Sequence, residues 1–319
     1  MLAVGAVAPV LWGTTYLTTT ELLPPGRPLL AGALRALPAG LLLVAAVGLL
    51  AGRATPRGAW WWRAAVLGTL NIGAFFALLF VAAYRLPGGV AAVLGALGPF
   101  AVAGLALLLL GLRPAGRTLT AAAVGLVGVA LLVLRSAVPL DPVGLAAAAG
   151  GTLSMSLGTV LGKRWGRPEG YRRPTTALLA LTGWQLTAGG LLLVPAALAV
   201  EGPPPGLTAG NLAGFGYLTL AGTAVAYVLW FGAVTRLAPS RVSLLALLSP
   251  VVAAVLGWVV LGQALSPAQL VGAAAVLGAV ALGVAAPAAA TPAAAPSAAI
   301  SPDGRDGRPA AAVAARFTG

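Results

Sequence analysis

The chain has 319 residues, of which 60% are hydrophobic and only 8% are charged, and its mean hydropathy is +0.99. A soluble domain is about one quarter charged, so this chain could not cover its own surface in water, and its apolar segments must face lipid. Cysteine and histidine are absent, which excludes disulfides, thiolate metal sites and the commonest proton shuttle. The net charge of +13 does not indicate nucleic acid, because the basic residues occupy short gaps between apolar runs.

Ten apolar segments are each long enough to cross a bilayer, which requires about 20 helical residues. Pro and Gly punctuate the gaps, as at residues 24–26 and 202–206, and these residues end helices. The first segment has no basic region before it and no cleavage site after it, so we interpret it as a spanning helix and not as a signal peptide. The expected spans are 2–20, 28–50, 60–83, 88–110, 118–134, 143–162, 175–200, 212–235, 242–261 and 268–285.

Loop charges predict how these helices are oriented. If the N-terminus is cytoplasmic, the inner loops and the C-terminal tail hold fifteen of the 19 Lys and Arg residues. The outer loops hold only Arg27, Arg85 and Arg135. Positive residues concentrate on the cytoplasmic side, so we expect a multi-pass protein of the inner cell membrane with both termini in the cytoplasm. One span more or fewer would exchange the inner and outer loops that follow it and destroy this bias. The bias therefore also supports ten spans.

The sequence contains two copies of one unit. The stretch Gly-Leu-Leu-Leu-Val at residues 40–44 recurs at residues 190–194, a shift of 150. At a shift of 151, Arg85, Leu86 and Pro99 recur as Arg236, Leu237 and Pro250. Each copy holds five spans, and because five is odd, the second copy must enter the membrane from the opposite side. The predicted fold is an all-α polytopic membrane protein whose ten transmembrane helices form two inverted five-helix repeats.

The duplication divides the chain into three parts. The first five-helix repeat is expected over residues 1–137 and the second over residues 138–287. Residues 288–319 are rich in Ala, Pro, Ser and Gly and have no periodic apolar face. We therefore expect a disordered cytoplasmic tail there.

Several short motifs lie along the two copies. They include Trp-Gly at 12–13, Leu-Arg at 34–35, the two prolines, the run 249–262 and the segment 266–270. Together they resemble the drug/metabolite transporter superfamily, specifically its ten-helix EamA-like permeases, over nearly all of residues 2–287. The resemblance implies a small-molecule carrier in the cytoplasmic membrane. The acidic residue that the family often carries after its Leu-Gly pair is Leu112 in the first copy and Gln263 in the second.

The third and eighth spans carry aromatic residues at equivalent positions. Phe76 and Phe80 are four residues apart, hence on one helix face, and they map at a shift of 151 onto Tyr227 and Phe231. Such pairs in both copies predict the walls of a central cavity, and the alternative is plain helix packing or lipid contact. The candidate cavity residues of these two spans are Asn71, Phe76, Phe80, Thr223, Tyr227 and Trp230.

Arg35 is the only basic residue well inside a span, roughly 10 Å from the outer end of its helix at about 1.5 Å per residue. Its counterpart at a shift of 150 is Gln185, so both copies place a long polar side chain at the same point. Arg35 would contact the carboxylate of an anionic or zwitterionic solute. Alternatively, it would bond helix-end carbonyls, which a long arginine reaches by snorkelling.

Trp12 and Tyr16 share one face of the first helix, in the middle of the span or beyond it. Aromatic anchors normally lie at the interfaces, so we expect Tyr16 to line the pathway, whereas Trp12 either lines it or anchors the helix. Pro99 and Pro250 occupy equivalent midpoints of the fourth and ninth spans. Proline removes a backbone donor, so kinks are expected there, with gating as a hypothesis.

The residues that the sequence lacks limit the energy sources and the chemistry that are open to the protein. No carboxylate and no histidine lies deep in a predicted span, so an embedded proton relay has no obvious carrier, and Glu21 at an outer end is the nearest candidate. A facilitator or solute exchanger fits at least as well. The sequence contains no P-loop and no cluster of nucleophile, acid or metal ligands. ATP-driven pumping, cofactors, metals and enzymatic catalysis are therefore not expected.

Two functions stay open from the sequence. The leading prediction is a secondary transporter that exports a small metabolite, amino-acid-like compound or drug by alternating access between the two repeats. The alternative is a lipid-translocating or other non-carrier membrane protein of the same fold. The expected partners are the small-molecule solute and the lipid bilayer, without nucleic acid, and a homodimer is compatible with the sequence.

Overall fold

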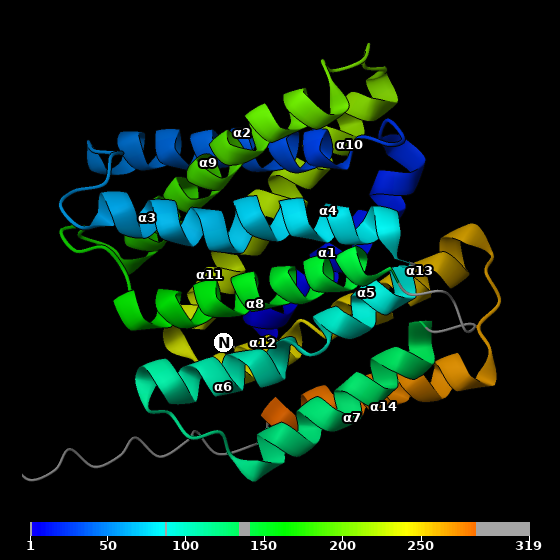
Figure 1. The fold of residues 1–319 in the computed structure, drawn as a ribbon. Coiled ribbons are helices and arrows are strands. Elements are labelled where there is room, and N and C mark those ends of the chain that lie inside the picture. The colour runs from blue at the N-terminus through cyan, green and yellow to red at the C-terminus, as the bar shows by residue number, and fades with distance from the viewer. Residues whose placement is uncertain (1, 87, 134–140, 285–319) are drawn as a thin grey trace, which may run out of the picture.

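The computed structural model describes residues 2–86, 88–133 and 141–284, and over these ranges the chain contains helices and no strand. Figure 1 shows the helices as a bundle of long rods lying side by side. In the described ranges, nine helical stretches are long and apolar enough to cross a membrane, and the tenth expected span is the shorter apolar helix Pro267–Gly283. The predicted all-helical membrane fold is confirmed. Residues 288–319 and the junction at 137/138 lie outside the described ranges.

Five spans form each half of the described bundle, and two spans in each half are built from more than one helix. The first half contains α1 (Leu2–Leu22), α2 (Pro28–Ala51), α3 (Trp60–Gly68) with η1 (Thr69–Gly73) and α4 (Ala74–Arg85), α5 (Gly88–Gly95) with α6 (Gly98–Leu110), and α7 (Gly116–Val133). The second half contains α8 (Pro142–Trp165), α9 (Pro174–Glu201), α10 (Ala209–Thr219) with η2 (Leu220–Val225) and α11 (Ala226–Arg236), α12 (Pro239–Leu245) with α13 (Leu248–Leu261), and α14 (Pro267–Val284).

Irregular backbone occurs at matching places in the two halves. The third span contains the π-helical segment η1, and the eighth contains η2 at a shift of 151. The fourth and ninth spans are interrupted at residues 96–97 and 246–247, where the N–H groups of Leu97, Ala246 and Leu247 make i→i−3 hydrogen bonds in place of the α-helical pattern. These interruptions come just before Pro99 and Pro250, whose missing N–H groups and bulky rings disfavour a continuous helix. Neither the duplication nor the hydropathy of the chain predicts the π segments, which often mark functional sites.

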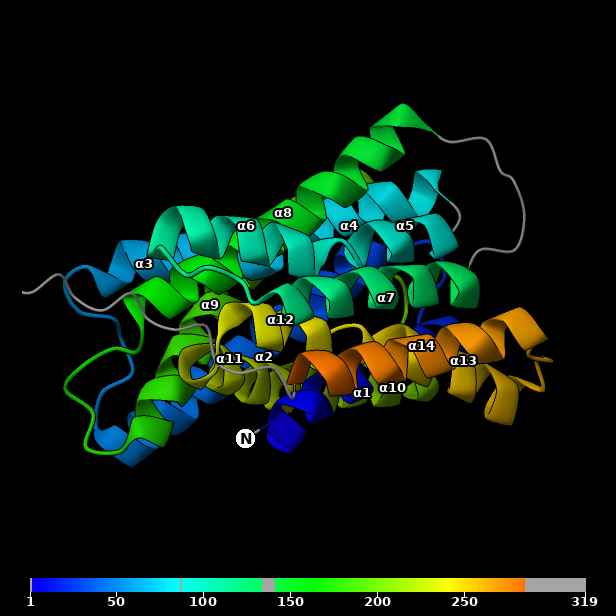
Figure 2. The same ribbon diagram turned by 90° about the horizontal axis from the view of Figure 1, so that it is seen from below.

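Helix packing follows the same two-fold pattern. The equivalent helices α2 and α9 pack against each other, and so do α7 and α14. The contact of α4 with α8 has its counterpart in that of α11 with α1, and the contact of α6 with α8 has its counterpart in that of α13 with α1. Figure 2 shows α7 and α14 side by side with α12 next to them. The first half therefore contacts the second half through the same helices by which the second half contacts the first.

The α2–α9 crossing is close because glycines lie at its contact points. A Cβ atom on Gly40 would collide with the backbone of Thr187, and one on Gly190 would lie 2.7 Å from Cα of Leu37. Gly40 and Gly190 are themselves equivalent at a shift of 150. Small residues let helix backbones approach in this way, so the duplicated glycines set the spacing of α2 and α9.

One end of this crossing is also fixed by a carboxylate. Both oxygens of Glu201, the last residue of α9, accept hydrogen bonds from backbone N–H groups in the first turn of α2: Leu29 at 2.6 Å and Leu30 at 2.9 Å. The first N–H groups of a helix have no partner within the helix and attract negative charge. The side chain of Glu201 therefore supplies a cap from the other repeat.

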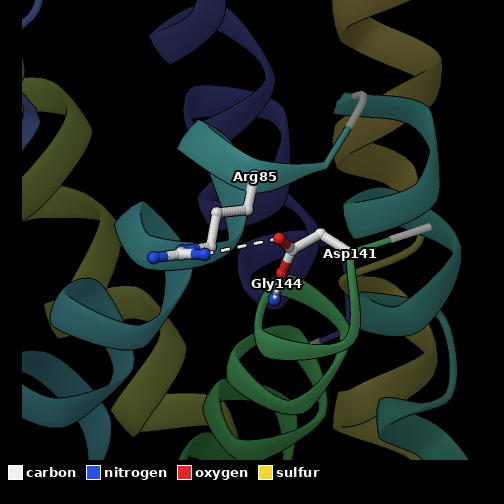
Figure 3. Close-up of polar contacts among 3 residues, drawn as sticks. All are labelled: Arg85, Asp141 and Gly144. Atoms are coloured by element: carbon white, nitrogen blue, oxygen red, sulfur yellow. Dashed lines mark hydrogen bonds and ion pairs between the residues drawn. The ribbon is translucent and has the colours of Figure 1, made fainter. Parts of the chain in front are cut away.

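Asp141 provides a second cap, at the start of α8. Its Oδ1 accepts a hydrogen bond from the Gly144 N–H at 2.8 Å, and its Oδ2 pairs with a guanidinium nitrogen of Arg85 at 3.3 Å (Figure 3). The hydrogen bond from Gly144 is the largest cause that lowers the pKa of the Asp141 carboxyl below its ordinary value. Desolvation opposes it, and the charge of Arg85 adds to the lowering. This contact joins the end of α4 to the start of the second repeat.

A pH dependence follows from the lowered pKa of Asp141. Because the fold favours the carboxylate, its stabilisation is complete above about pH 4 and is lost as the pH falls through the lower pKa of the folded protein. We expect the thermal midpoint of the detergent-solubilised protein to fall more between neutral and strongly acidic pH than that of Asp141→Asn, which keeps a capping side chain but cannot ionise. Tryptophan fluorescence during heating measures both, and equal acid losses in the two proteins would contradict the assignment.

Candidate functional site

Arg35 connects the two repeats near the middle of the bundle. It lies on α2, is only 8% exposed, and its Nε donates a hydrogen bond to Thr223 Oγ1 at 2.8 Å. A second guanidinium nitrogen donates to the carbonyl oxygen of Gly222 at 2.8 Å. Both acceptors belong to the π segment η2 of the other repeat. Arg35 thus stays inside the bundle and does not extend to its end, and it bonds a carbonyl in the middle of a span.

Gln185 makes the equivalent contact in the second repeat. It lies on α9, is 1% exposed, and its Oε1 accepts a hydrogen bond from Asn71 Nδ2 at 2.9 Å. Asn71 belongs to the π segment η1 of the first repeat. Gln185 also donates to the carbonyl of Leu181 at 3.3 Å. In both halves, therefore, a long polar side chain of the second helix contacts the π segment of the other half, but only Arg35 carries a charge.

Aromatic rings adjoin Arg35. The guanidinium carbon lies 5.5 Å from the ring centroid of Phe76, and Phe76 and Tyr227 belong to one buried apolar cluster. The Trp12 ring centroid lies 5.2 Å from that of Tyr227 and 5.0 Å from that of Trp230. We call Trp12, Arg35, Phe76, Tyr227 and Trp230 the central cluster. All five side chains are buried except that of Trp12, which is half-buried.

Several buried polar atoms around the central cluster have no hydrogen-bond partner among the described residues. They include the indole nitrogens Nε1 of Trp12 and Trp230 and the hydroxyl of Thr15. The Thr15 hydroxyl and the Arg35 guanidinium both lie near Gly222. Leaving a buried donor unpaired costs about 1–3 kcal/mol, so such atoms are uncommon in the absence of a ligand or water.

The structure brings together most of the residues that the sequence singled out. Trp12, Arg35, Phe76, Tyr227 and Trp230 form the central cluster, and Asn71 pairs with Gln185 nearby in the duplicated arrangement. Pro99 and Pro250 lie in the first turns of α6 and α13, where the second halves of the interrupted spans begin. The side chains of Tyr16 and Phe80 lie outside the part of the structure that is described.

Two participants were not predicted from the sequence. The carbonyls of Gly222 and Leu181 accept hydrogen bonds from Arg35 and Gln185. Every residue carries a backbone carbonyl, so its use as an acceptor leaves no mark in the residue type. The only available signal was positional, because Gly222 is the counterpart of Asn71 at a shift of 151.

A cavity of about 370 Å³ lies beside the central cluster and not within it. It lies between α2 and α10, and among its lining side chains only that of Thr219 is polar. Several lining residues are exposed on the flank of the bundle, including Leu42 at 51% and Leu212 at 58%. The remaining lining residues are Leu34, Pro38, Leu207, Phe215, Gly216 and Leu220.

The duplicated contacts agree with a comparison against known protein families. The sequence profile of the EamA-like transporter family matches residues 1–134 and again residues 142–284. The chain belongs to the EamA-like transporter family. The predicted membership of the drug/metabolite transporter superfamily is thereby confirmed, and this EamA-like protein is a multi-pass membrane protein of a transporter family.

Two curated relatives and one solved structure support the same assignment. Protein PecM of Dickeya dadantii (strain 3937) is 46% identical to this EamA-like chain over 269 residues, which cover 84% of the chain and 87% of PecM. The uncharacterized inner membrane transporter YedA of Escherichia coli K12 is 29% identical over 262 residues, 81% of each protein. A crystal structure with 23% identity shares the fold, with a TM-score of 0.73 over 88% of this chain and 96% of that one.

Proposed function

We propose that this EamA-like protein is a secondary transporter, without enzymatic activity, that exports a small metabolite, amino-acid-like compound or drug across the cytoplasmic membrane by alternating access. The observation that carries this proposal is the exchange of equivalent contacts between the two halves. A pair of oppositely inserted repeats that make the same contacts can open to either side by exchanging conformations. A receptor or a scaffold does not require that symmetry.

The proposed route for the solute passes through the central cluster. Arg35 and Gln185 each contact the π segment of the opposite repeat, so a movement of one repeat relative to the other must change these contacts. Aromatic rings beside them offer a surface for an organic solute. The interruptions before Pro99 and Pro250 are proposed as hinge points of this movement.

Charge supports an orientation with both termini in the cytoplasm. Arg53, at one end of the bundle, donates a hydrogen bond to the carbonyl of Glu169 in the loop that follows α8. Trp184 on α9 bonds the carbonyl of Ala54 at the same end. These contacts place the α2–α3 loop beside the arginine-rich α8–α9 loop, and so concentrate positive charge at the end that we assign to the cytoplasm. The inner-membrane description of the relative YedA supports the same membrane.

Lipid translocation is the second candidate function, and one observation favours it. The cavity between α2 and α10 has an apolar lining that suits an acyl chain. Its exposed lining residues lie on the flank that would face lipid. Movement of a lipid along this flank would not require the central cluster.

Reconstitution separates the two functions. Proteoliposomes that contain the full chain are loaded with a panel of labelled neutral, cationic, anionic and zwitterionic metabolites, and solute efflux is measured in parallel with scrambling of fluorescent phospholipids. We expect solute efflux that depends on the protein and lipid scrambling no faster than in empty liposomes. Lipid movement without efflux of any solute class would refute the proposal. Comparison of the metabolites exported by cells with and without the chain then tests the outward direction.

A further inference from the structure

The central cluster carries a positive charge that no described carboxylate neutralises. The hydrogen bonds of Arg35 go to a threonine hydroxyl and a backbone carbonyl, neither of which is charged. The described carboxylates are engaged elsewhere or lie at helix ends and loops: Glu201 caps α2, and Asp141 pairs with Arg85. A buried charge without a counter-charge is unfavourable, so its presence points to a ligand that supplies the missing charge.

Hydrogen-bond donors without acceptors lie in the same cluster. The indole N–H groups of Trp12 and Trp230 are buried and unpaired among the described residues. An indole nitrogen only donates, so its missing partner must be an acceptor. The two indoles are in ring contact, and Trp12 also contacts Tyr227. Tyr227 and Trp230 belong to one buried apolar cluster with Phe76, whose ring lies 5.5 Å from the Arg35 guanidinium carbon. Charge and donors together describe a site for an anion that accepts several hydrogen bonds.

The duplication limits the number of anionic groups to one. At the position equivalent to Arg35, the second repeat has Gln185, which already accepts a hydrogen bond from Asn71. That pair is neutral and offers no second cation. The flat rings of Phe76, Tyr227 and the two tryptophans provide apolar walls beside the single charge.

We infer that the transported solute is a small organic anion with one carboxylate on a flat apolar body. The carboxylate takes the place of Gly222 and Thr223 as the acceptor for Arg35 and accepts the unpaired indole N–H groups, while the apolar body packs against the aromatic rings. This inference rests on the proposed transport function and specifies its substrate class. Arg35 stays protonated throughout, and no covalent step is involved.

Three probes of nearly equal shape and different charge test the inference. Phenylacetate, phenylacetamide and phenethylamine carry one negative charge, no charge and one positive charge. Exchange flux of each labelled probe is measured at zero membrane potential in proteoliposomes that contain the full chain. We expect the flux of phenylacetate to exceed that of either congener by about tenfold or more, because a charge-assisted hydrogen bond is roughly twice as strong as a neutral one.

Variants connect this preference to the cluster. Arg35→Gln introduces the residue that occupies the equivalent position, and it is expected to abolish the preference for phenylacetate. Arg117→Gln removes an exposed charge at the start of α7 and serves as the matched control, with unchanged flux. If Arg35→Gln does not fold, Trp12→Phe and Trp230→Phe serve instead, since each keeps an aromatic ring but loses the N–H donor, and each is expected to reduce phenylacetate flux severalfold more than phenylacetamide flux.

The results distinguish the substrate class from the transport function. Flux of phenylacetamide or phenethylamine equal to that of phenylacetate overturns the anion assignment and leaves the transport function standing. Absence of flux for all three probes also overturns it, and efflux of another solute class from the metabolite panel would then still support a transporter. A preference for phenylacetate that survives in Arg35→Gln, or in both tryptophan variants, removes the cluster as its origin.

Discussion

Solute flux is expected to fall about tenfold or more when Arg35 is replaced by Ala, because the substitution removes two hydrogen bonds from a charged group as well as the charge itself. Tyr227→Ala is expected to reduce flux by a comparable factor. Tyr227 is 2% exposed and packs against Trp12 and Phe231, so truncation deletes the wall next to the charge. Flux in proteoliposomes, normalised to the amount of inserted protein, measures both effects.

Controls separate loss of the site from loss of the fold. Truncation of a large buried ring costs about 3–5 kcal/mol of stability, so Tyr227→Phe is included because it keeps the ring and removes only the hydroxyl. We expect Tyr227→Phe to insert normally and to retain more flux than Tyr227→Ala. Unchanged flux in both Arg35→Ala and Tyr227→Ala, at normal insertion, would exclude the central cluster from the solute pathway.

The second large effect is expected at the α2–α9 crossing. Gly40→Val and Gly190→Val each place a branched side chain against the backbone of the facing helix, which cannot yield as a flexible side chain would. Overpacking of this kind typically costs about 1–3 kcal/mol, and we expect the upper part of that range at both sites. A lower thermal midpoint, followed by intrinsic tryptophan fluorescence in detergent, measures the loss.

The matched control for these glycines is Gly104→Val on α6. Gly104 is exposed, and a Cβ atom added there meets no other atom within 4 Å. Valine forms helix slightly better than glycine, so this variant is expected to keep or raise the midpoint. If Gly40→Val and Gly190→Val were as stable as Gly104→Val, the close crossing of α2 and α9 would be disproved.

Much of the fold was predictable because a membrane span is a local property of the sequence. About 20 apolar residues in a row suffice to cross a bilayer, wherever the other helices lie, and the expected spans agree with the described helices to within about three residues at each end. The interruptions in the fourth and ninth spans also have a local cause, since Pro99 and Pro250 lack the backbone N–H that a continuous helix needs. The π segments had no comparable signal, since neither η1 nor η2 contains a proline.

The candidate site was predictable only in part. The duplication singled out Arg35 with Gln185 and Phe76 with Tyr227 as positions that occur twice, and the structure shows what each of them contacts. Pairing of Gln185 with Asn71 and of Arg35 with Thr223 depends on the rotation and depth of two helices that are more than 100 residues apart in the chain. Residue types alone do not encode those quantities.

The sequence by itself determined that this protein lies in a membrane, how many spans it has and that it is duplicated. Hydropathy and a constant shift of 150 or 151 residues are properties of the chain alone. Only the tertiary structure decided that Arg35 bonds the π segment of the opposite repeat, that Gly40 and Gly190 lie at the contact points of α2 and α9, and that the indoles of Trp12 and Trp230 meet without acceptors. The physical reason is that a backbone carbonyl, a close approach and an unpaired donor each depend on what the facing helix presents, and that is fixed only when the helices pack.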